Sequence, residues 1–558
     1  MSVIDNIVVV DIIKGTQGVS RPGFGIPFLL SYHGNFAEKY KQYNSLAEVG
    51  ADFNTSSVEY ARAQVLFDST TKDNNGKRML VPEKIFIGRL PTNVRISVLS
   101  STDGTYKFSI NNTEFSFVAS SDSKADIASG IVALINASAE PVTAVYTATN
   151  EYFDLYADVS GVDFSVLIDE ATQFSVGLSR QLSTLTFASD LITDNAVNLN
   201  VVHNDVEWAM PAVTFTTDME TTAGLIATAL ETNPYISSAT VSATPFRTIT
   251  IETIDNREIS ITDIVVTLGT TQTTGTFAET KSFKNGDCKT FLNALTFQDY
   301  YFVLYARDFY DNAEVADLSD FLENWEYKKA FWFNTNDSRI GTETALNVIA
   351  QIKAKAIARG KLVSSIERTV AVYTKQLDNY VADGLIGANG DKTAGGITWA
   401  YKKAKLCIYD DYTNQASILS FLRSNNANYY TRVAGLDMSS PSDKGGITIG
   451  GEYFDITHGS DWLKANLELD VVETMALNDK IPFTNKGVSI LVNKVYSRMQ
   501  EAQAVGFLSD EEDILVTAVD IDDLTSAQRQ SRIFEKITAS GRFAGAIQKT
   551  YIEVNLTF

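Results

Sequence analysis

The histidines and cysteines of this 558-residue chain are the side chains from which catalysis or metal binding would most readily be built. The three histidines, His33, His203 and His458, are far apart and belong to different predicted modules. Neither cysteine has a nucleophile context: Cys288 precedes a predicted helix, and Cys407 belongs to an apolar segment that predicts a strand over 405–408. No Gly-x-Ser-x-Gly, His-Glu-x-x-His or Cys-x-x-Cys motif occurs. These residues therefore predict neither nucleophilic catalysis nor a metal centre.

A glycine-rich segment at 384–393 has the composition of a phosphate-binding loop. Such a loop needs a lysine directly after its last glycine, so that the ammonium group reaches the bound phosphates. Here Asp391 stands between Gly390 and Lys392 and puts a negative charge where phosphate would bind. No apolar strand leads into the segment. We therefore predict a flexible turn at 384–393 and no nucleotide site.

Polar residues follow two predicted strands, at the edge where parallel α/β sheets bind ligands. They are Asp308, Asn334 and Asp337. Asp and Asn are also common there as turn and capping residues, and we favour that interpretation. Acidic pairs such as Asp410 and Asp411 do not identify a glycosidase in a chain this acidic. The chain is predicted not to be an enzyme, with no catalytic residues, no cofactor and no metal.

The composition limits the possible partners and compartments. A formal net charge of −22 and a pI near 4.6 oppose contact with phosphate backbones, so direct nucleic-acid binding is excluded. Two cysteines supply no disulfide framework. The first residues lack the basic stretch of a secretory signal, and no apolar run is long enough to cross a bilayer. We expect folding in a reducing cytoplasm, without membrane insertion.

Charge is distributed unevenly near the C-terminus. An acidic stretch at 510–523 precedes a basic one at 529–549. Two interpretations stay open: two solvated faces, or complementary patches that steer one subunit onto another. The candidate electrostatic contacts are Glu511, Glu512, Asp513, Arg529, Arg532 and Arg542.

At 558 residues the chain exceeds the size of one hydrophobic core, so several domains are expected. The predicted helices and strands indicate an α+β and α/β multidomain protein. Apolar runs at 300–306, 330–333 and 368–373 predict buried strands. Helical patterns separate them, the first opened by a capping box at Asp311 and the second running from about 343 to 359. This order predicts a βαβαβ unit with a parallel sheet.

Residues 92–180 and 181–280 repeat one order of elements, hairpin, helix and hairpin, about 95 residues apart. We interpret them as two related α+β modules inserted into the α/β core, and we expect the ends of the insertion, near Pro91 and Phe283, to lie close together. The predicted domains are an N-terminal arm (1–20), a first core segment (21–91), the two modules, an α/β core domain (281–400), a helix-rich C-terminal domain (401–540) with apolar stripes at 462–476 and 486–504, and a C-terminal arm (541–558).

Both chain ends predict β-strands. The last eight residues alternate strictly between apolar and polar side chains, whereas residues 4–13 are apolar almost throughout. Two interpretations stay open: these strands close sheets of their own subunit, or they pair with a neighbouring chain through unpaired edges. The candidate inter-subunit residues are Ile7, Val8, Val9, Val10 and Ile12 at one end, and Tyr551, Ile552, Val554, Leu556 and Phe558 at the other.

Several short segments, in their order and spacing, resemble contractile tail sheath proteins of bacteriophages. The likeness covers roughly residues 1–90 and 281–558, and the two modules resemble the variable insertions of such sheaths. The segments are 20–28, 396–399, 426–429, 451–454, 461–464, 481–482 and 541–547.

This resemblance implies a structural subunit that forms hexameric rings, stacked helically around a tail tube. Contraction of the stack would drive the tube through the host envelope during genome delivery. The implied partners are further copies of the chain, the tail tube protein, and baseplate and tail terminator proteins. Strands donated by both terminal arms would join the subunits by β-augmentation. The resemblance also implies assembly in the host bacterial cytoplasm and a place in the tail of the virion.

Other functions remain as alternatives. The sheath of a phage-derived bacteriocin, or of another contractile injection system, would share the same design. A surface-layer or adhesin-like protein would also have Thr-rich strand repeats and few cysteines, but it would need an export signal. A cytoplasmic carbohydrate-active enzyme would fit the aromatic content, but it would need a convergent pair of acids.

Overall fold

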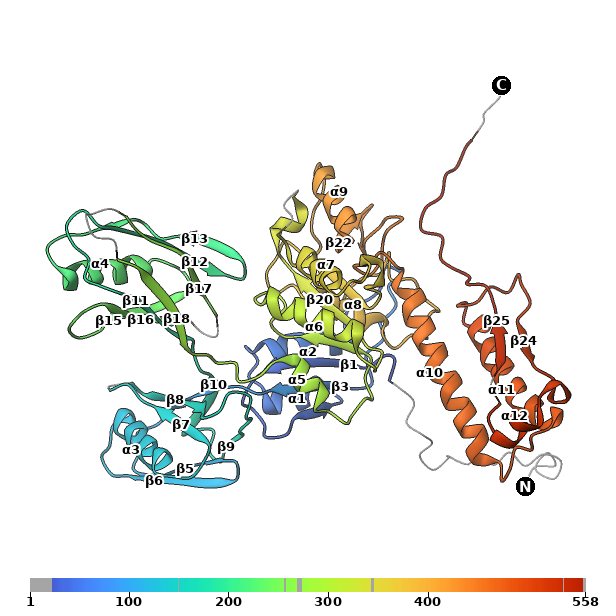
Figure 1. The fold of residues 1–558 in the computed structure, drawn as a ribbon, viewed down its shortest axis with the longest axis horizontal. Coiled ribbons are helices and arrows are strands. Elements are labelled where there is room, and N and C mark those ends of the chain that lie inside the picture. Colours follow the sequence, from blue (N-terminus) through green and yellow to red (C-terminus); the bar gives the residue numbers. More distant parts are fainter. Residues whose placement is uncertain are drawn as a thin grey trace.

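The computed structural model describes residues 23–148, 150–254, 257–267, 273–342, 346–534 and 536–554. A central α/β domain carries two smaller modules on one side and a helical unit on the other (Figure 1). The chain passes from the first strands of the central domain through both modules and then returns to the same sheet.

The central domain is built on an eight-stranded sheet of order β2-β3-β1-β19-β20-β21-β22-β23. Its six inner strands run parallel, and β2 and β23 are antiparallel edges. Inner strands such as β1 and β20 are buried on both faces, as their continuous apolar sequences predict. The strands are β1 (Pro27–Tyr32), β2 (Tyr40–Tyr43), β3 (Ile85–Leu90), β19 (Phe302–Tyr305), β20 (Ala330–Thr335), β21 (Thr369–Tyr373), β22 (Asn428–Val433) and β23 (Leu436–Ser439).

Helices cover both faces of this sheet. Buried residues of α1 (Leu46–Asp52), α2 (Val58–Phe67) and α8 (Val381–Asn389) pack on one face. The other face is covered by α5 (Cys288–Asn293), α6 (Asn312–Asn324), α7 (Val348–Ala358) and α9 (Ala416–Asn425), with short 3-10 turns at η2 (Ser338–Gly341) and η3 (Val363–Ser365). The side chain of Asp311 caps α6 by accepting a hydrogen bond from the backbone of Glu314, the contact that the capping-box spacing predicts.

The prediction of a flexible turn at 384–393 is wrong, because most of this segment belongs to the buried helix α8. A Cβ atom on Gly384 would lie 2.7 Å from the Sγ atom of Cys407, and one on Gly387 would lie 2.9 Å from the carbonyl oxygen of Leu66. The glycines therefore serve close packing of the helix against its neighbours.

The predicted strand at 405–408 is also absent. Leu406 has a φ of 49°, a left-handed conformation that an extended strand does not adopt. Cys407 lies in an irregular segment, where its Sγ atom is 2.8 Å from the carbonyl oxygen of Lys405.

Each inserted module contains one helix packed on two antiparallel sheets, with its own hydrophobic core. In the first, the sheets have the orders β10-β4-β8-β7 and β6-β5-β9; in the second, they are β18-β11-β16-β15 and β13-β12-β14, with β17 also paired to β12. The first module comprises β4 (Val94–Val98), β5 (Gly104–Ile110), β6 (Thr113–Ala119), α3 (Lys124–Asn136), β7 (Val142–Val145), β8 (Tyr152–Ala157), β9 (Val166–Ile168) and β10 (Phe174–Leu178). The second comprises β11 (Leu182–Phe187), β12 (Ala196–His203), β13 (Val206–Ala209), β14 (Val213–Thr214), α4 (Met219–Leu230), β15 (Ile236–Val241), β16 (Thr248–Thr253), β17 (Ser260–Thr267) and β18 (Gly275–Lys281).

The two ends of the insertion lie side by side on the central domain. The backbone N–H of Asn93 donates to the carbonyl of Phe283 over 2.7 Å, and that of Asn285 donates to the carbonyl of Pro91 over 3.1 Å. Thr92 and Lys284 form an isolated antiparallel bridge between these contacts. The chain therefore leaves and re-enters the central domain at one point, as expected from the sequence.

The helical unit begins with α10 (Phe454–Leu477). The start of α10 packs in the central domain through Phe454, and its middle packs against the next helix through Trp462. Because β22 and β23 join the large sheet, this unit starts later in the chain than the predicted boundary at 401. Its other elements are α11 (Asn485–Ala504), β24 (Leu515–Ala518), η4 (Ile521–Asp523), α12 (Ser526–Ser531) and β25 (Ile537–Ser540). Within the described residues, no helix has the length and apolar character needed to cross a membrane.

Candidate assembly surface

The carboxyl edge of the parallel strands is filled by a buried ion cluster. Arg62 of α2 donates from Nε and Nη2 to the carboxylate of Asp383, each over 2.8 Å, and its Nη2 lies 3.2 Å from Asp308. The amide of Asn334 donates to both carboxylates over 3.0 Å. Burial raises the pKa of Asp308 to about 6, against the opposing charge of Arg62. Removing one partner from such a cluster typically costs about 3–5 kcal/mol, so these residues, like Asp337, which caps η2, support the fold.

The three histidines occupy separate apolar sites. His458 stacks on Tyr301 and Phe454, with ring centroids 4.9 and 5.6 Å away, and burial lowers its pKa to about 4. His33 packs beside phenylalanine rings, and Nδ1 of His203 lies 2.8 Å from a backbone carbonyl oxygen. Among the described residues, no three His, Cys, Asp or Glu side chains are arranged to hold a metal ion. Of the candidate polar residues, the structure brings together Asp308 and Asn334 in the buried ion cluster, and it leaves the three histidines at separate sites.

The C-terminal arm contacts its own subunit along residues 542–548, with its last hydrogen-bonded anchor at Gln548, and then leaves the body of the subunit (Figure 1). At the anchor, the hydroxyl of Tyr401 donates to the carbonyl of Gln548 over 2.6 Å, and the Gln548 amide donates to Thr398 and to the carbonyl of Gly445. Beyond it, residues 551–554 belong to no strand. The exposed fractions of the candidate side chains are 85% for Tyr551, 81% for Ile552 and 70% for Val554.

The remaining arm candidates lie outside the described residues. They are Leu556 and Phe558 at the C-terminal end, and Ile7, Val8, Val9, Val10 and Ile12 at the N-terminal end.

A small sheet in the helical unit offers open strand edges. Strands β24 and β25 pair antiparallel with each other, from Leu515 opposite Ser540 to Ala518 opposite Ile537. Neither has a second strand partner among the described residues. Two-stranded sheets are marginal alone, and this one packs on α11 through Val516 and Ile537. An open edge of this kind can accept a strand from another chain.

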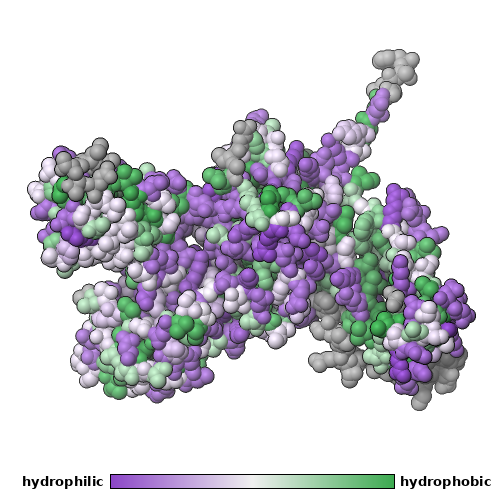
Figure 2. Space-filling view, viewed as in Figure 1, coloured by the Kyte–Doolittle hydropathy of each residue, from purple (hydrophilic) through white to green (hydrophobic). Residues whose placement is uncertain are grey.

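Apolar surface also gathers along α10, where Figure 2 shows green residues beside the helical unit. The exposed fractions are 54% for Val472, 55% for Met475 and 85% for Leu477. Apolar side chains at this end of the helix therefore lie uncovered in the isolated subunit.

The candidate electrostatic residues form one pair within the subunit. Arg542 Nη1 lies 3.0 Å from Glu512, and both side chains are largely exposed. These two side chains are therefore paired within the isolated subunit. The side chains of Glu511, Asp513, Arg529 and Arg532 are exposed and form no ion pair with other described residues.

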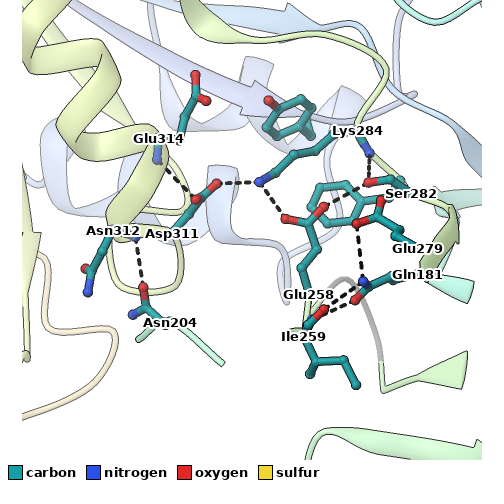
Figure 3. Close-up of polar contacts among 12 residues, drawn as sticks. Gln181, Asn204, Glu258, Ile259, Glu279, Ser282, Lys284, Asp311, Asn312 and Glu314 are labelled. Carbon is teal, nitrogen blue, oxygen red and sulfur yellow. Dashed lines mark hydrogen bonds and ion pairs between the residues drawn. The ribbon is translucent and has the colours of Figure 1, made fainter. Parts of the chain in front are cut away.

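A polar junction that the sequence does not reveal ties the second module to the central domain (Figure 3). Lys284 Nζ lies 2.5 Å from Glu258 of the module and 2.7 Å from Asp311, the cap of α6. Burial raises the pKa of Asp311, but the charge and hydrogen bond of Lys284 outweigh it and hold that pKa below its usual value. Asn204, at the β12–β13 turn, accepts from the backbone N–H of Asn312 over 2.8 Å. In the sequence, the Asn-Asp pair at 204–205 indicates a hairpin turn, but it does not indicate that this turn contacts the central domain.

Residues 454–556 match the family model for the C-terminal domain of E217 gp31-like tail sheath proteins. The comparison with curated proteins found no match. The matched segment contains α10, α11, the β24–β25 sheet and the anchored part of the C-terminal arm.

Three solved structures are similar at low sequence identity. The sheath tail protein of Desulfitobacterium hafniense is 11% identical, with 92% of this chain and 93% of that chain covered and a TM-score of 0.38. The contracted sheath of an extracellular contractile injection system, PVC, is 11% identical, with coverages of 50% and 76% and a TM-score of 0.33. The contracted helical sheath of the anti-feeding prophage is 10% identical, with coverages of 48% and 72% and a TM-score of 0.32.

These structures are too dissimilar to this chain to assign its function. The family match, in contrast, covers the helical unit with the β24–β25 sheet and the C-terminal arm. That match confirms the resemblance predicted from the sequence for this part of the chain: residues 454–556 are similar to the C-terminal domain of gp31-like tail sheath proteins.

Proposed function

We propose that this chain is a structural subunit of a contractile tail sheath, that it polymerises as hexameric rings stacked around a tail tube, and that contraction of the stack drives the tube through the host envelope. The observation that carries the proposal is the C-terminal arm, which is anchored at Gln548 and then presents exposed alternating apolar side chains away from its own subunit. Such an arm is suited to joining copies of the chain. Assembly would take place in the host cytoplasm, with the tube, baseplate and terminator proteins as further partners.

The joint between subunits is a donated strand. Residues 551–558 of one copy would pair with an open edge of the β24–β25 sheet in the next copy, with Ile552 and Val554 on one face. Each backbone hydrogen bond contributes only about 0.5–1.5 kcal/mol net, but a strand of this length makes several. Burying one exposed aliphatic side chain adds about 1.5–3 kcal/mol. Residues 7–12 would form a second joint from the other end.

The inserted modules are a duplicated unit that faces solvent and takes no part in the joints. The sheets β10-β4-β8-β7 and β18-β11-β16-β15 have equivalent strand orders, and each module has its own core. The parallel unit β19-α6-β20-α7-β21 belongs to the sheath core that carries them. This organisation predicts that the modules can vary while the assembly is retained.

Removing residues 549–558 tests the donated strand. The truncated protein should keep its thermal unfolding nearly unchanged, because the described arm side chains beyond Gln548 are exposed. It should fail to form sheath-length polymers in negative-stain microscopy. Normal polymers would make the strand dispensable, and an unfolded monomer would assign it to its own subunit.

A charge-matched pair of variants separates strand pairing from non-specific repulsion. Ile552→Asp with Val554→Asp puts two carboxylates on the apolar side of the arm and should abolish polymers. Asn555→Asp with Thr557→Asp adds the same charge on the opposite side of the alternating pattern and should retain them. Equal loss in both variants would contradict burial of the apolar side.

A further inference from the structure

A hollow of about 380 Å³ on the central domain is lined by basic side chains, although the chain carries a net charge of −22. We call it the basic hollow. Three segments form it: the loop at 73–80, the end of α8 with the following residues, and the loop at 401–403. Its cations are Lys77, Arg78, Lys392, Lys402 and Lys403.

The cations of the basic hollow outnumber the one acidic residue of its lining, Asp73. Within the described parts of the chain, none of the five forms an ion pair with a carboxylate. Asp73 is the acidic residue of the lining, and its carboxylate accepts hydrogen bonds from the backbone N–H groups of Asn75 and Lys77. Partial burial, together with the charge of Lys402, lowers the pKa of Lys392. Like charges held together in this way favour an anionic partner.

The part of the C-terminal arm that follows Gln548 starts at the rim of this hollow. Tyr401 lines the hollow and also donates to the carbonyl of Gln548, the anchor of the arm. The ten residues 549–558 then span at most roughly 33 Å, at about 3.3 Å per residue. A neighbouring sheet that receives the arm must therefore lie within that reach of the basic hollow.

The sheet proposed to receive the arm is flanked by acidic segments. Residues 510–513 precede β24 directly, and residues 520–523 follow it. Glu512 pairs with Arg542, and Asp520 accepts a hydrogen bond from Asn485. The other five carboxylates are exposed and form no ion pair within the described residues: Asp510, Glu511, Asp513, Asp522 and Asp523.

We propose that the basic hollow of one subunit binds an acidic segment beside β24 of the neighbouring copy that receives its C-terminal arm. The two oppositely charged surfaces lie at the two ends of one short tether, so pairing of the arm brings them together. The contact rests on the proposed strand donation and adds to it a charged partner for each joint. In this proposal the acidic stretch at 510–523 binds the basic hollow of a neighbouring copy, and not Arg529, Arg532 and Arg542.

Zero-length cross-linking tests the contact directly. Polymers assembled from an equal mixture of ¹⁴N- and ¹⁵N-labelled subunits are treated with a carbodiimide, which joins a lysine amine to a carboxylate with loss of water. Mass spectrometry should find mixed-isotope peptide pairs that join Lys77, Lys392, Lys402 or Lys403 to residues 510–523. Cross-links from these lysines only to other carboxylates, or only within one subunit, would overturn the proposal.

Charge reversal gives an independent measurement. Lys402→Glu with Lys403→Glu should raise the protein concentration needed for polymerisation at least about tenfold, because like charges facing each other across an interface cost several kcal/mol. The control is Lys289→Glu with Lys361→Glu, which changes the net charge equally at two exposed lysines outside the hollow and should have little effect. Two lysines introduced into the acidic segment identified by cross-linking should restore assembly of the hollow variant.

The arm truncation separates this proposal from the proposed function. If truncation abolishes polymers while the Lys402→Glu, Lys403→Glu variant polymerises like its control, the charged contact is refuted and strand donation stands. If the truncated protein polymerises normally, strand donation fails, and the contact that rests on it fails too. If the hollow serves a different partner, no cross-links will join its lysines to residues 510–523, and the Lys402→Glu, Lys403→Glu variant will polymerise at the same protein concentration as its control. That result also refutes the proposal.

Discussion

At the scale of single residues, the side chains that suggested chemistry contribute to packing and to internal pairing. Asp308 and Asn334 complete the Arg62 cluster, and His458 lies among aromatic rings at the start of α10. His458 Nε2 lies 3.1 Å from the carbonyl oxygen of Phe24, so this side chain links the helical unit to the residues that precede β1. These positions join segments that are distant in the sequence.

Burial of His458 makes a pH-dependent contribution to stability. Its pKa is about 4 in the folded protein and 6.5 in an exposed reference, so between these values the unfolded chain binds more protons. This contribution is complete above pH 6.5 and is lost as the pH falls toward 4, by up to about 3 kcal/mol. Asp308, with a raised pKa of about 6, acts in the opposite direction over much of this range.

A comparison of the wild type with His458→Phe isolates the contribution of His458 to the free energy of unfolding. Urea unfolding of both proteins at several pH values should show that the stability of the wild type relative to the variant declines from pH 6.5 to pH 4. The contribution of Asp308 cancels in that difference because both proteins retain it. A difference that does not change with pH would contradict a neutral buried imidazole.

At the scale of elements, helix α8 shows how glycine supports close packing. Its nine residues are all buried, and Gly387 lies directly against the backbone of Leu66 in α2. Glycine costs about 0.5–1 kcal/mol relative to alanine in a helix interior, and here the close approach of the two helices requires it.

Gly387→Ala should therefore destabilise the protein by about 1–3 kcal/mol, since the added Cβ atom would lie 2.9 Å from a backbone oxygen. Gly224→Ala in α4 is the matched control, because a Cβ atom there meets nothing within 4 Å. The control should be neutral or stabilising by up to about 1 kcal/mol. Chemical denaturation of both variants provides the measurement, and equal effects would argue against the close helix contact.

At the scale of the whole molecule, the inserted modules are joined to a core that is continuous without them. Their chain ends meet at the bridge between Thr92 and Lys284, and strands β1, β3 and β19 lie together in the large sheet. The polar junction limits this independence, because Lys284 and Asn312 each lose a partner when the second module is removed. Lys284 keeps its ion pair with Asp311.

Deleting residues 92–280 and bridging the ends with a short Gly-Ser linker should leave a soluble protein that still polymerises. We expect a moderate loss of stability, because the polar groups of the central domain that contact the second module would then face water. Circular dichroism and sedimentation would report folding and assembly. A protein that folds but remains monomeric would assign the modules to the subunit interface, and an insoluble product would assign them to the core.

The sequence by itself determined the elements whose pattern is local. Strands predicted at 300–306, 330–333 and 368–373 correspond to Phe302–Tyr305, Ala330–Thr335 and Thr369–Tyr373, and Asp311 is the N-cap of α6, as its spacing predicts. The order and spacing of short segments also predicted a resemblance to tail sheath proteins, which the match over 454–556 confirms for that part of the chain. Burial on both faces leaves a continuous apolar run, and a cap has a fixed spacing, so each is visible in a few residues.

Tertiary structure decided what depends on contacts between distant segments. Residues near 66 and 407 pack against the glycines of helix α8, and β22 extends the sheet by pairing with β21 and in turn pairs with β23. The basic hollow likewise combines loops more than 300 residues apart, beside the anchor of the C-terminal arm. Such contacts leave no periodic pattern in the chain, since each partner contributes only one or two residues and their proximity arises only when the whole domain folds.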